Sequence, residues 1–368
     1  YEEYFARIKS GDPSKLVVII DEAQFVAKRD ASFMEAVAKL KKHKLYPGPV
    51  LIILATSSTV WATQEAAEQF KGAEMKLESL NFLEVVRHFE SLPVAEIVRI
   101  YGAIGGVPAY LDKWDAAKSF KDNICRLVLT PSGALYGEAD AVISSELREI
   151  SAYSTILAAI ARGENKLNDI FHATGFSRAK ISVYLKNLAT FNIVEKVVSF
   201  ETGGWENAKK GVYQIKDTFV NFWCKCVNPN NSNLFLLSPE EFYDTYIEKE
   251  LDAYLERYFR EVCTEYLLIL NQMGQLPFAI KRVGTWIGKT GRIDIVAQSE
   301  DRRSIIGFCN WDKPMMTMDM CENMAMAMEQ ARLTSDDYYL FSATDFEPAL
   351  QSYVVRDPRF KLINMNEL

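Results

Sequence analysis

Apolar residues gather in two short runs near the start of the chain, with an amphipathic stretch between them. Leu16–Ile20 and residues 50–55 are continuous and rich in valine, isoleucine and leucine, which is typical of strands buried on both faces of a sheet. Residues 32–44 place apolar side chains on one face and lysines on the other, which predicts a helix. Strand, helix and strand in this order predict a β-α-β unit with a parallel sheet.

Polar side chains follow both apolar runs directly. Asp21 and Glu22 come after the first run, and Thr56 and Ser57 come after the second. Since open parallel sheets bind ligands at the carboxyl ends of their strands, we expect these side chains to meet at one edge of the sheet. An ordinary core strand that ends in two acids would give the same pattern without any chemistry.

The first run and its two acids resemble the Walker B strand of P-loop ATPases, and the hydroxyl cluster resembles the sensor 1 position of AAA+ proteins. The resemblance implies that Asp21 holds Mg²⁺ through water and that Glu22 polarises the attacking water. The candidate catalytic residues are therefore Asp21, Glu22, Thr56 and Ser57, with Asp21 as the metal-binding residue.

A P-loop ATPase also needs a Walker A loop, G-x-x-x-x-G-K-[ST], whose backbone N–H groups cradle the phosphates. The chain contains one GK[ST] sequence, Gly288-Lys289-Thr290, but the glycine before it, Gly284, is one residue too close. This sequence also lies far beyond the Walker B strand and between strand-like segments, which predicts a hairpin loop. We therefore expect the phosphate loop upstream of Tyr1, and ATP and Mg²⁺ as cofactors of the intact protein only.

The next motifs make the resemblance more specific. An Asn-Phe-Leu segment at residues 81–83 precedes Gly-Gly-Val-Pro-Ala-Tyr-Leu at residues 105–111. This order resembles the prokaryotic and archaeal AAA+ ATPases that carry a C-terminal domain of unknown function. The resemblance implies an AAA+ core over residues 1–92 and a helical lid over residues 93–150, although a glycine pair is also an ordinary helix end. The family often has an arginine-rich stretch before the Leu-x-Phe segment, whereas residues 60–86 contain no arginine.

Residues 151–227 predict a winged helix-turn-helix. Two helical patterns precede Gly175, Ser177 is a good N-cap for a third helix over Arg178–Thr190, and two strand-like segments follow. A recognition helix of this kind presents basic and amide side chains to DNA. The candidate DNA-binding residues are Arg178, Lys180, Lys186, Asn187, Lys209 and Lys210. Acidic residues nearby favour the alternative, in which the module only couples neighbouring domains.

The pattern changes again after a polar stretch at residues 228–233, which predicts a linker. A long amphipathic helix over residues 242–270 begins the last part of the chain. The segments that follow are strands at 278–283, 292–297 and 304–311, a methionine-rich helix at 316–333, a strand at 338–341, a helix from 346 and a strand at 360–363. This order resembles the restriction-endonuclease-like fold of the C-terminal domain in the same ATPase family, and it assigns residues 236–368 to that domain.

Active members of that fold carry an acid on the first helix, an Asp near a strand start and E-x-K on the next strand, which together bind Mg²⁺ and position water. Glu261 and Asp294 match the first two positions, but Phe308 and Asn310 stand where the second carboxylate and the lysine belong. Phenylalanine cannot ligate a hard cation, which needs oxygen. We therefore expect an inactive, vestigial nuclease site, and Glu261 and Asp294 are equally consistent with ordinary hydrogen-bonded acids.

Composition narrows the function further. The chain has 368 residues, of which 49% are apolar and 12% aromatic, so it is long and apolar enough for several packed domains. A net charge of −7 excludes a uniformly basic surface, although a local basic face stays compatible. The 6 cysteines lack metal-ligand spacing. Since no apolar run is long enough for a membrane span and no signal peptide is visible, we expect a cytoplasmic protein without membrane contact.

The sequence therefore predicts a multidomain α/β protein that works as an AAA+-type ATPase, a nucleotide-driven switch with a winged helix and an inactive nuclease-like domain. The alternative is a non-enzymatic regulator that binds DNA through the winged helix or a protein partner through the C-terminal domain. Residual nuclease activity is a third hypothesis, and the sequence leaves the oligomeric state open. A first residue other than methionine indicates a fragment or a processed chain.

Overall fold

The computed structural model describes residues 16–42, 50–58, 60–70, 72–144, 147–200, 211–288 and 291–368. The chain divides into two compact units, Tyr1–Glu78 and Ser79–Leu368, and the described part of each contains both helices and strands. The fold is therefore mixed α/β. The predicted boundary of the first domain fell after residue 92, whereas residues 79–92 pack with the second unit.

The first unit is built around two parallel strands, β1 (Leu16–Ile20) and β2 (Val50–Leu54), which pair in register over their whole length. Its helices are α2 (Ala23–Arg29), α3 (Phe33–Lys42) and α4 (Ala67–Phe70), with a π-helical turn at Trp61–Ala66. Buried side chains of these helices, such as Phe33 and Trp61, pack against alternate strand residues.

The outer face of this two-stranded sheet corrects one prediction. Both strands were expected to be buried on both faces, but Ile19 is 66% exposed and Leu51 is 56% exposed. Successive side chains of a strand point to opposite faces of the sheet. Residues that pack against the helices therefore alternate with residues that face outward. The apolar character of each run therefore predicted a strand correctly. The prediction that both faces of each strand would be buried was wrong.

The second unit opens with a group of short helices. They are α5 (Phe82–His88), α6 (Val94–Ile104), α7 (Pro108–Leu111), α8 (Phe120–Ile124) and α9 (Glu138–Ser144), with a π-helical turn at Cys125–Leu129. Asn81 and Glu84 form a capping box at the start of α5. The carboxylate of Glu265 accepts two further N–H bonds there, from Phe82 at 3.0 Å and Leu83 at 3.1 Å. A distant acid thus completes the N-terminus of α5.

The glycine pair between α6 and α7 makes a close backbone contact. Gly105 has φ +67°, a left-handed conformation that favours glycine. The carbonyl of Gly106 accepts a hydrogen bond from the N–H of Leu80 at 2.8 Å, and a Cβ on Gly106 would lie only 1.8 Å from the Leu80 carbonyl oxygen. The two glycines therefore permit the chain before α5 to lie against the end of α6.

Three helices and a hairpin follow, in the order that the sequence predicted. They are α10 (Ile150–Ala161), α11 (Leu167–Thr174), α12 (Arg178–Thr190), β3 (Val194–Val197) and β4 (Val212–Ile215), and the two strands pair antiparallel. Gly175 ends α11 with φ +69°, and the hydroxyl of Ser177 accepts the N–H of Lys180 at 3.2 Å. Local signals thus set both sides of the turn between α11 and α12.

The connection to the last part of the chain is helical. It comprises α13 (Thr218–Phe222), a π-helical turn at Trp223–Val227, 3₁₀ turns at Asn228–Phe235, α14 (Pro239–Phe242) and a second π-helical turn at Tyr243–Ile247. The polar residues 228–233, predicted as a linker, form part of the 3₁₀ turns inside the second unit.

A five-stranded mixed sheet, in the order β11-β9-β7-β6-β5, ends the chain. Its strands are β5 (Arg282–Ile287), β6 (Arg292–Gln298), β7 (Ser304–Asn310), β9 (Asp337–Ser342) and β11 (Phe360–Asn364). The remaining elements are α15 (Glu248–Gln272), α16 (Met318–Ala331), α17 (Pro348–Arg356), a 3₁₀ turn at Met365–Glu367 and the short pair β8 (Met315–Met316) and β10 (Asp345–Phe346). Strands β7, β9 and β11 run parallel, and β5 and β6 pair antiparallel.

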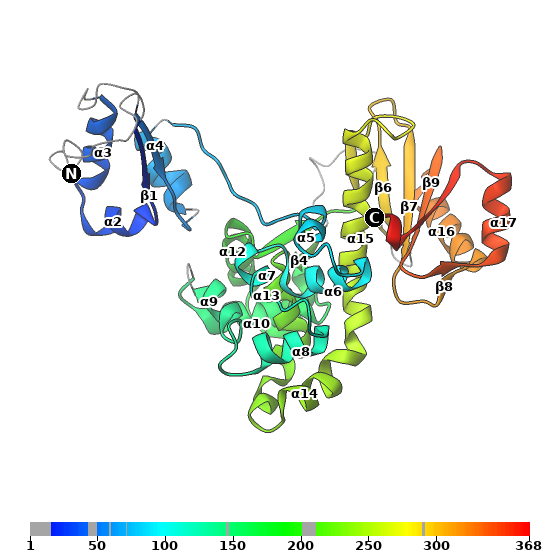
Figure 1. Cartoon of the computed structure of the whole chain (residues 1–368), viewed down its shortest axis with the longest axis horizontal. Helices are drawn as coiled ribbons and strands as arrows, with labels where there is room; N and C mark the ends of the chain where they lie inside the picture. The colour runs from blue at the N-terminus through cyan, green and yellow to red at the C-terminus, as the bar shows by residue number, and fades with distance from the viewer. Residues whose placement is uncertain are drawn as a thin grey trace. The chain divides into compact units, whose positions relative to one another are not determined.

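Helices cover both faces of this sheet. Helix α15 lies along one face and α16 along the other (Figure 1), and separate clusters of buried side chains fill the two sides. The predicted first strand, residues 278–283, is wrong, because β5 begins only at Arg282. The reason is a side chain: Asn271 of α15 bonds both the N–H and the carbonyl of Ile280, at 2.7 and 3.3 Å.

Candidate functional site

The four candidate catalytic residues lie at the carboxyl edge of the β1–β2 sheet. The hydroxyl of Ser57 donates to Glu22 Oε2 at 2.9 Å, and the Ser57 N–H reaches the same oxygen at 3.3 Å. The backbone pairing of the two strands continues to this edge, since the N–H of Ala55 donates to the carbonyl of Ile20 at 2.9 Å. The structure therefore brings the acid after β1 and the hydroxyl after β2 together, as parallel strands with matching ends require.

Gln24 holds this edge together, and the sequence alone did not single it out as a site residue. It is only 2% exposed, and its side-chain NH₂ donates to Glu22 Oε2 and to Ser57 Oγ. Its carbonyl oxygen accepts the hydroxyl of Thr56 at 2.6 Å. The sequence signal that could have found Gln24 is its position: it is a polar residue in the first turn of the helix that follows the two acids.

The two acids differ in their surroundings. Glu22 adopts a left-handed backbone conformation with φ +47°. The hydrogen bond from Gln24, and then the one from Ser57, lower the pKa of the Glu22 carboxyl, because both stabilise its charged form. Asp21 is exposed, and its carboxylate accepts only the N–H of Glu22, at 2.9 Å, within the described residues.

This edge offers oxygen ligands of the kind that Mg²⁺ prefers. They are the carboxylates of Asp21 and Glu22 and the hydroxyls of Thr56 and Ser57. No group of three or more histidine, cysteine, aspartate or glutamate side chains suited to a metal occurs in the described part of the chain. A cation at this edge would therefore need water or a ligand's own oxygens to complete its coordination.

Helix α12 exposes only some of the candidate DNA-binding residues. Lys186 is exposed and Val183, on the same face, is 57% exposed, whereas the side chain of Asn187 donates to the hydroxyl of Tyr153 at 2.8 Å. The side chain of Asn187 thus joins α12 to α10 by a hydrogen bond and does not face outward as a free amide. Lys209 and Lys210 lie outside the described residues.

The two remaining basic residues of α12 rest on aromatic rings. The guanidinium of Arg178 lies 4.1 Å from the ring centre of Phe171 and donates to Asn168 at 2.9 Å. The ammonium of Lys180 lies 4.5 Å from the ring of Phe176. Both side chains stay exposed, and a phosphate would have to compete with cation–π contacts for them.

The predicted vestigial nuclease residues engage the protein itself. Asp294 is 8% exposed and lies in ion pairs with Arg292 at 3.4 Å and Arg260 at 3.7 Å. Burial raises its pKa, while the two arginines act in the opposite direction. Glu261 pairs instead with Arg257 at 2.8 Å. Different arginines therefore neutralise the two acids. A metal cation would have to displace these arginines before it could bind the carboxylates.

The other two positions of that predicted site also have structural roles. Phe308 packs into the apolar cluster between the sheet and α16. The next residue, Cys309, donates its N–H to the carboxylate of Asp294 at 3.1 Å. Asn310 is 2% exposed, and its NH₂ donates to Ser342 Oγ at 3.0 Å. Asn310 thus ties the end of β7 to the end of β9.

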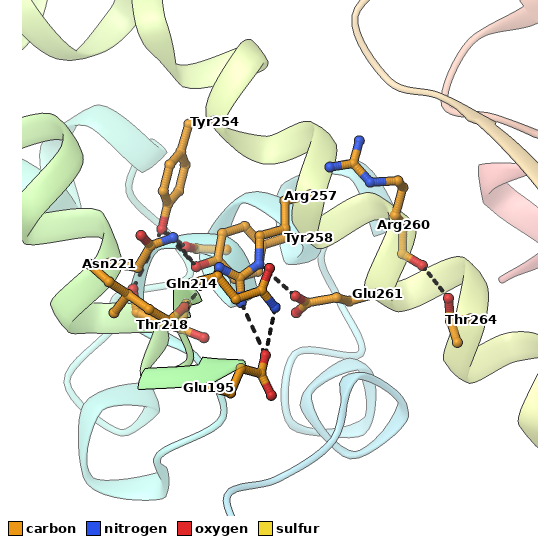
Figure 2. A network of polar contacts seen from close by, with 12 residues as sticks. Glu195, Gln214, Thr218, Asn221, Tyr254, Arg257, Tyr258, Arg260, Glu261 and Thr264 are labelled. Atoms are coloured by element: carbon orange, nitrogen blue, oxygen red, sulfur yellow. Dashed lines mark hydrogen bonds and ion pairs between the residues drawn. The ribbon is translucent and has the colours of Figure 1, made fainter. Parts of the chain in front are cut away.

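A partly buried polar network joins β3, β4 and α13 to α15, and the sequence did not predict it. Figure 2 shows Arg257 and Tyr258 of α15 directed toward Asn221, Gln214 and Glu195. Arg257 donates to the carbonyl of Ile215 at 2.8 Å. The only signal in the sequence is a basic residue between tyrosines on the apolar side of a long helix.

The cysteines of the described chain are all free. The C-x-C pair, Cys224 and Cys226, is buried, and burial raises the pKa of each thiol to about 12. Such thiols are protonated and inert at neutral pH. No helix in the described ranges has the length and apolar composition that crossing a bilayer requires.

Comparisons with known proteins give two sequence matches, neither of which carries a described activity. Residues 223–326, from the π-helical turn after α13 into α16, match the family DUF234, described as archaeal and bacterial proteins of unknown function. The chain is also similar to the uncharacterized protein MJECL04 of Methanocaldococcus jannaschii, with 27% identity over 352 residues that cover 93% of this chain and 77% of that protein.

A solved structure gives a weaker match. The crystal structure of protein VC1899 from Vibrio cholerae aligns with 96% of this chain and 88% of its own at 10% identity and a TM-score of 0.24. At this TM-score the likeness supports no inference about the fold.

Proposed function

We propose that this chain is part of an ATP-dependent switch protein, with the edge of the β1–β2 sheet as the metal side of its nucleotide site. The observation that supports the proposal is the contact between Glu22 and Ser57 at the carboxyl ends of two parallel strands. Asp21 lies beside it, exposed and free to reach a cation through water.

The residues would divide the work as follows. Asp21 would hold Mg²⁺, which supplies charge compensation to a triphosphate. Glu22 would orient the attacking water as an ionised carboxylate, the form that any ordinary glutamate has at neutral pH. Gln24 is a positioning residue, since it holds Glu22 and Thr56 in place without being exposed itself. The winged-helix elements and the five-stranded sheet would respond to nucleotide, and nuclease chemistry would be absent.

The proposal is tested by ATP binding and hydrolysis with the complete gene product. Glu22→Gln should lower the hydrolysis rate by about 10²-fold or more, because it removes the carboxylate that orients water. Nucleotide affinity should stay within about threefold, since Glu22 contributes little to ground-state binding. The matched control is Glu65→Gln, an exposed acid of the same unit, which should leave both quantities unchanged. Unchanged hydrolysis in Glu22→Gln would refute the assignment.

A second candidate is DNA binding by α12. The observation that favours it is the outward face of this helix, where Lys186 and Ser182 are exposed and a capped N-terminus presents Arg178. The engagement of Asn187 with Tyr153 counts against direct reading of bases by that residue. Binding of this kind would depend mainly on phosphate contacts and would fall steeply with salt.

A further inference from the structure

A cavity of about 190 Å³ lies where the winged-helix elements meet α13 and α15. The residues that matter for its chemistry are Ala161, Tyr213, Gln214, Asn221, Lys225 and Arg257. Figure 2 shows four of the lining residues, Gln214, Asn221, Tyr254 and Arg257, converging from three different elements. Small-molecule sites commonly combine such an apolar wall with a few convergent polar groups.

Two of the polar lining residues are already satisfied by the protein. Arg257 is bonded to Glu261 and to the carbonyl of Ile215, both at 2.8 Å. The hydroxyl of Tyr254 donates to the carbonyl of Gly102 at 2.7 Å. These two side chains therefore form a fixed wall and have little bonding capacity left for a ligand.

Three other lining residues keep unused capacity. Lys225 is half-buried, and within the described ranges its ammonium has no ion pair or hydrogen bond. Gln214 and Asn221 each donate their NH₂ to the protein, to Glu195 at 2.6 Å and to the hydroxyl of Tyr258 at 2.8 Å. Their carbonyl oxygens accept no hydrogen bond from the part of the chain that the structure describes. Beside the paired Arg257, one unpaired cation and two unused acceptors of the described chain thus border the cavity.

We propose that this cavity binds a small organic monocarboxylate that also carries a hydrogen-bond donor. The single uncompensated ammonium of Lys225 matches one negative charge, whereas a dianionic phosphate monoester would bring one charge too many into a partly buried site. The donor would meet the carbonyl oxygen of Gln214 or Asn221. A volume of about 190 Å³ suits one ring or a short chain, since cavities of roughly 150 Å³ hold benzene.

The test is a calorimetric titration of the full chain with 4-hydroxybenzoate, which combines one ring, one carboxylate and one donor. We expect saturable binding, and binding of the neutral 4-hydroxybenzamide that is weaker by about tenfold or more. Lys225→Met should weaken binding of the carboxylate to the level of the amide. The matched control, Lys113→Met, changes an exposed lysine that does not line the cavity and should bind like the wild type.

A second variant separates the cavity from the charge. Ala161→Leu adds volume to the wall without altering any charged or polar group, and it should abolish binding of both 4-hydroxybenzoate and the amide. Thermal unfolding of each variant without ligand verifies that it is folded. Absence of saturable binding by the wild type, or equal binding by the wild type and a folded Lys225→Met, would overturn the proposal. Neither result bears on ATP hydrolysis, which depends on residues of the other unit.

Discussion

At the scale of single residues, Gln24 shows how a short polar side chain can organise an entire edge. Its one amide group contacts both acid and hydroxyl residues from two strands. Because Gln24 itself is only 2% exposed, leaving its amide without hydrogen-bond partners would cost about 1–3 kcal/mol. Asn310 plays the same part between β7 and β9. Both residues act by positioning their neighbours.

The glycine pair before α7 yields a prediction at the same scale. Gly106→Ala should destabilise the second unit by about 3 kcal/mol or more, because its Cβ would meet the Leu80 carbonyl oxygen at 1.8 Å and backbone cannot rotate away. The measurement is the free energy of unfolding in denaturant. Gly137→Ala is the control, since nothing lies within 4 Å of its Cβ, and it should change stability by less than about 0.5 kcal/mol.

At the scale of elements, α12 has two faces with different tasks. Its inner face packs through Ile181, Leu185 and Leu188, and Asn187 adds a hydrogen bond to Tyr153 of α10. Its outer face keeps Lys186 exposed. A substitution on either face therefore reports on a different property of the helix.

We expect Lys186→Ala to weaken binding of duplex DNA at low salt and to reduce the slope of log affinity against log salt by about 1, if α12 contacts phosphates. The free energy of unfolding of the Lys186→Ala variant should stay unchanged. Asn187→Ala should do the reverse and lower stability by about 1 kcal/mol, because it removes the bond to Tyr153. Fluorescence anisotropy at several salt concentrations measures the first effect. Absence of wild-type binding at low salt would exclude the DNA hypothesis.

At the scale of the whole molecule, the chain is two units joined near residue 78. Residues 72–79 are all exposed and belong to no helix or strand, and Met75 and Leu77 are 84% and 86% exposed. A segment with few contacts and an accessible backbone is a preferred site for proteases.

Brief digestion of the native protein with trypsin should therefore cut after Lys76, the one lysine or arginine in residues 72–79. The product that begins at Leu77 contains the entire second unit and should persist, because that unit has its own core. Mass spectrometry of the fragments identifies the cut. Lys76→Gln should remove this product, and a wild-type digest in which residues 72–79 stay intact would contradict the division.

Local sequence signals predicted many elements closely. Helix α12 spans Arg178–Thr190 as expected, because the Ser177 cap and the preceding glycine mark its start. The two apolar runs near the start are parallel strands, as their composition indicated. The strand predicted at residues 278–283 failed because Asn271, on another element, takes the backbone bonds of Ile280.

The sequence by itself determined where most helices and strands lie, since periodicity, caps and glycines act over a few residues. It also indicated that Asp21, Glu22, Thr56 and Ser57 would share an edge, because parallel strands end together. Only the tertiary structure decided which partners the charged groups take. Arg260 reaches Asp294, and Arg257 reaches Glu195, from distant parts of the chain. Such pairings depend on how elements pack, which no local pattern records.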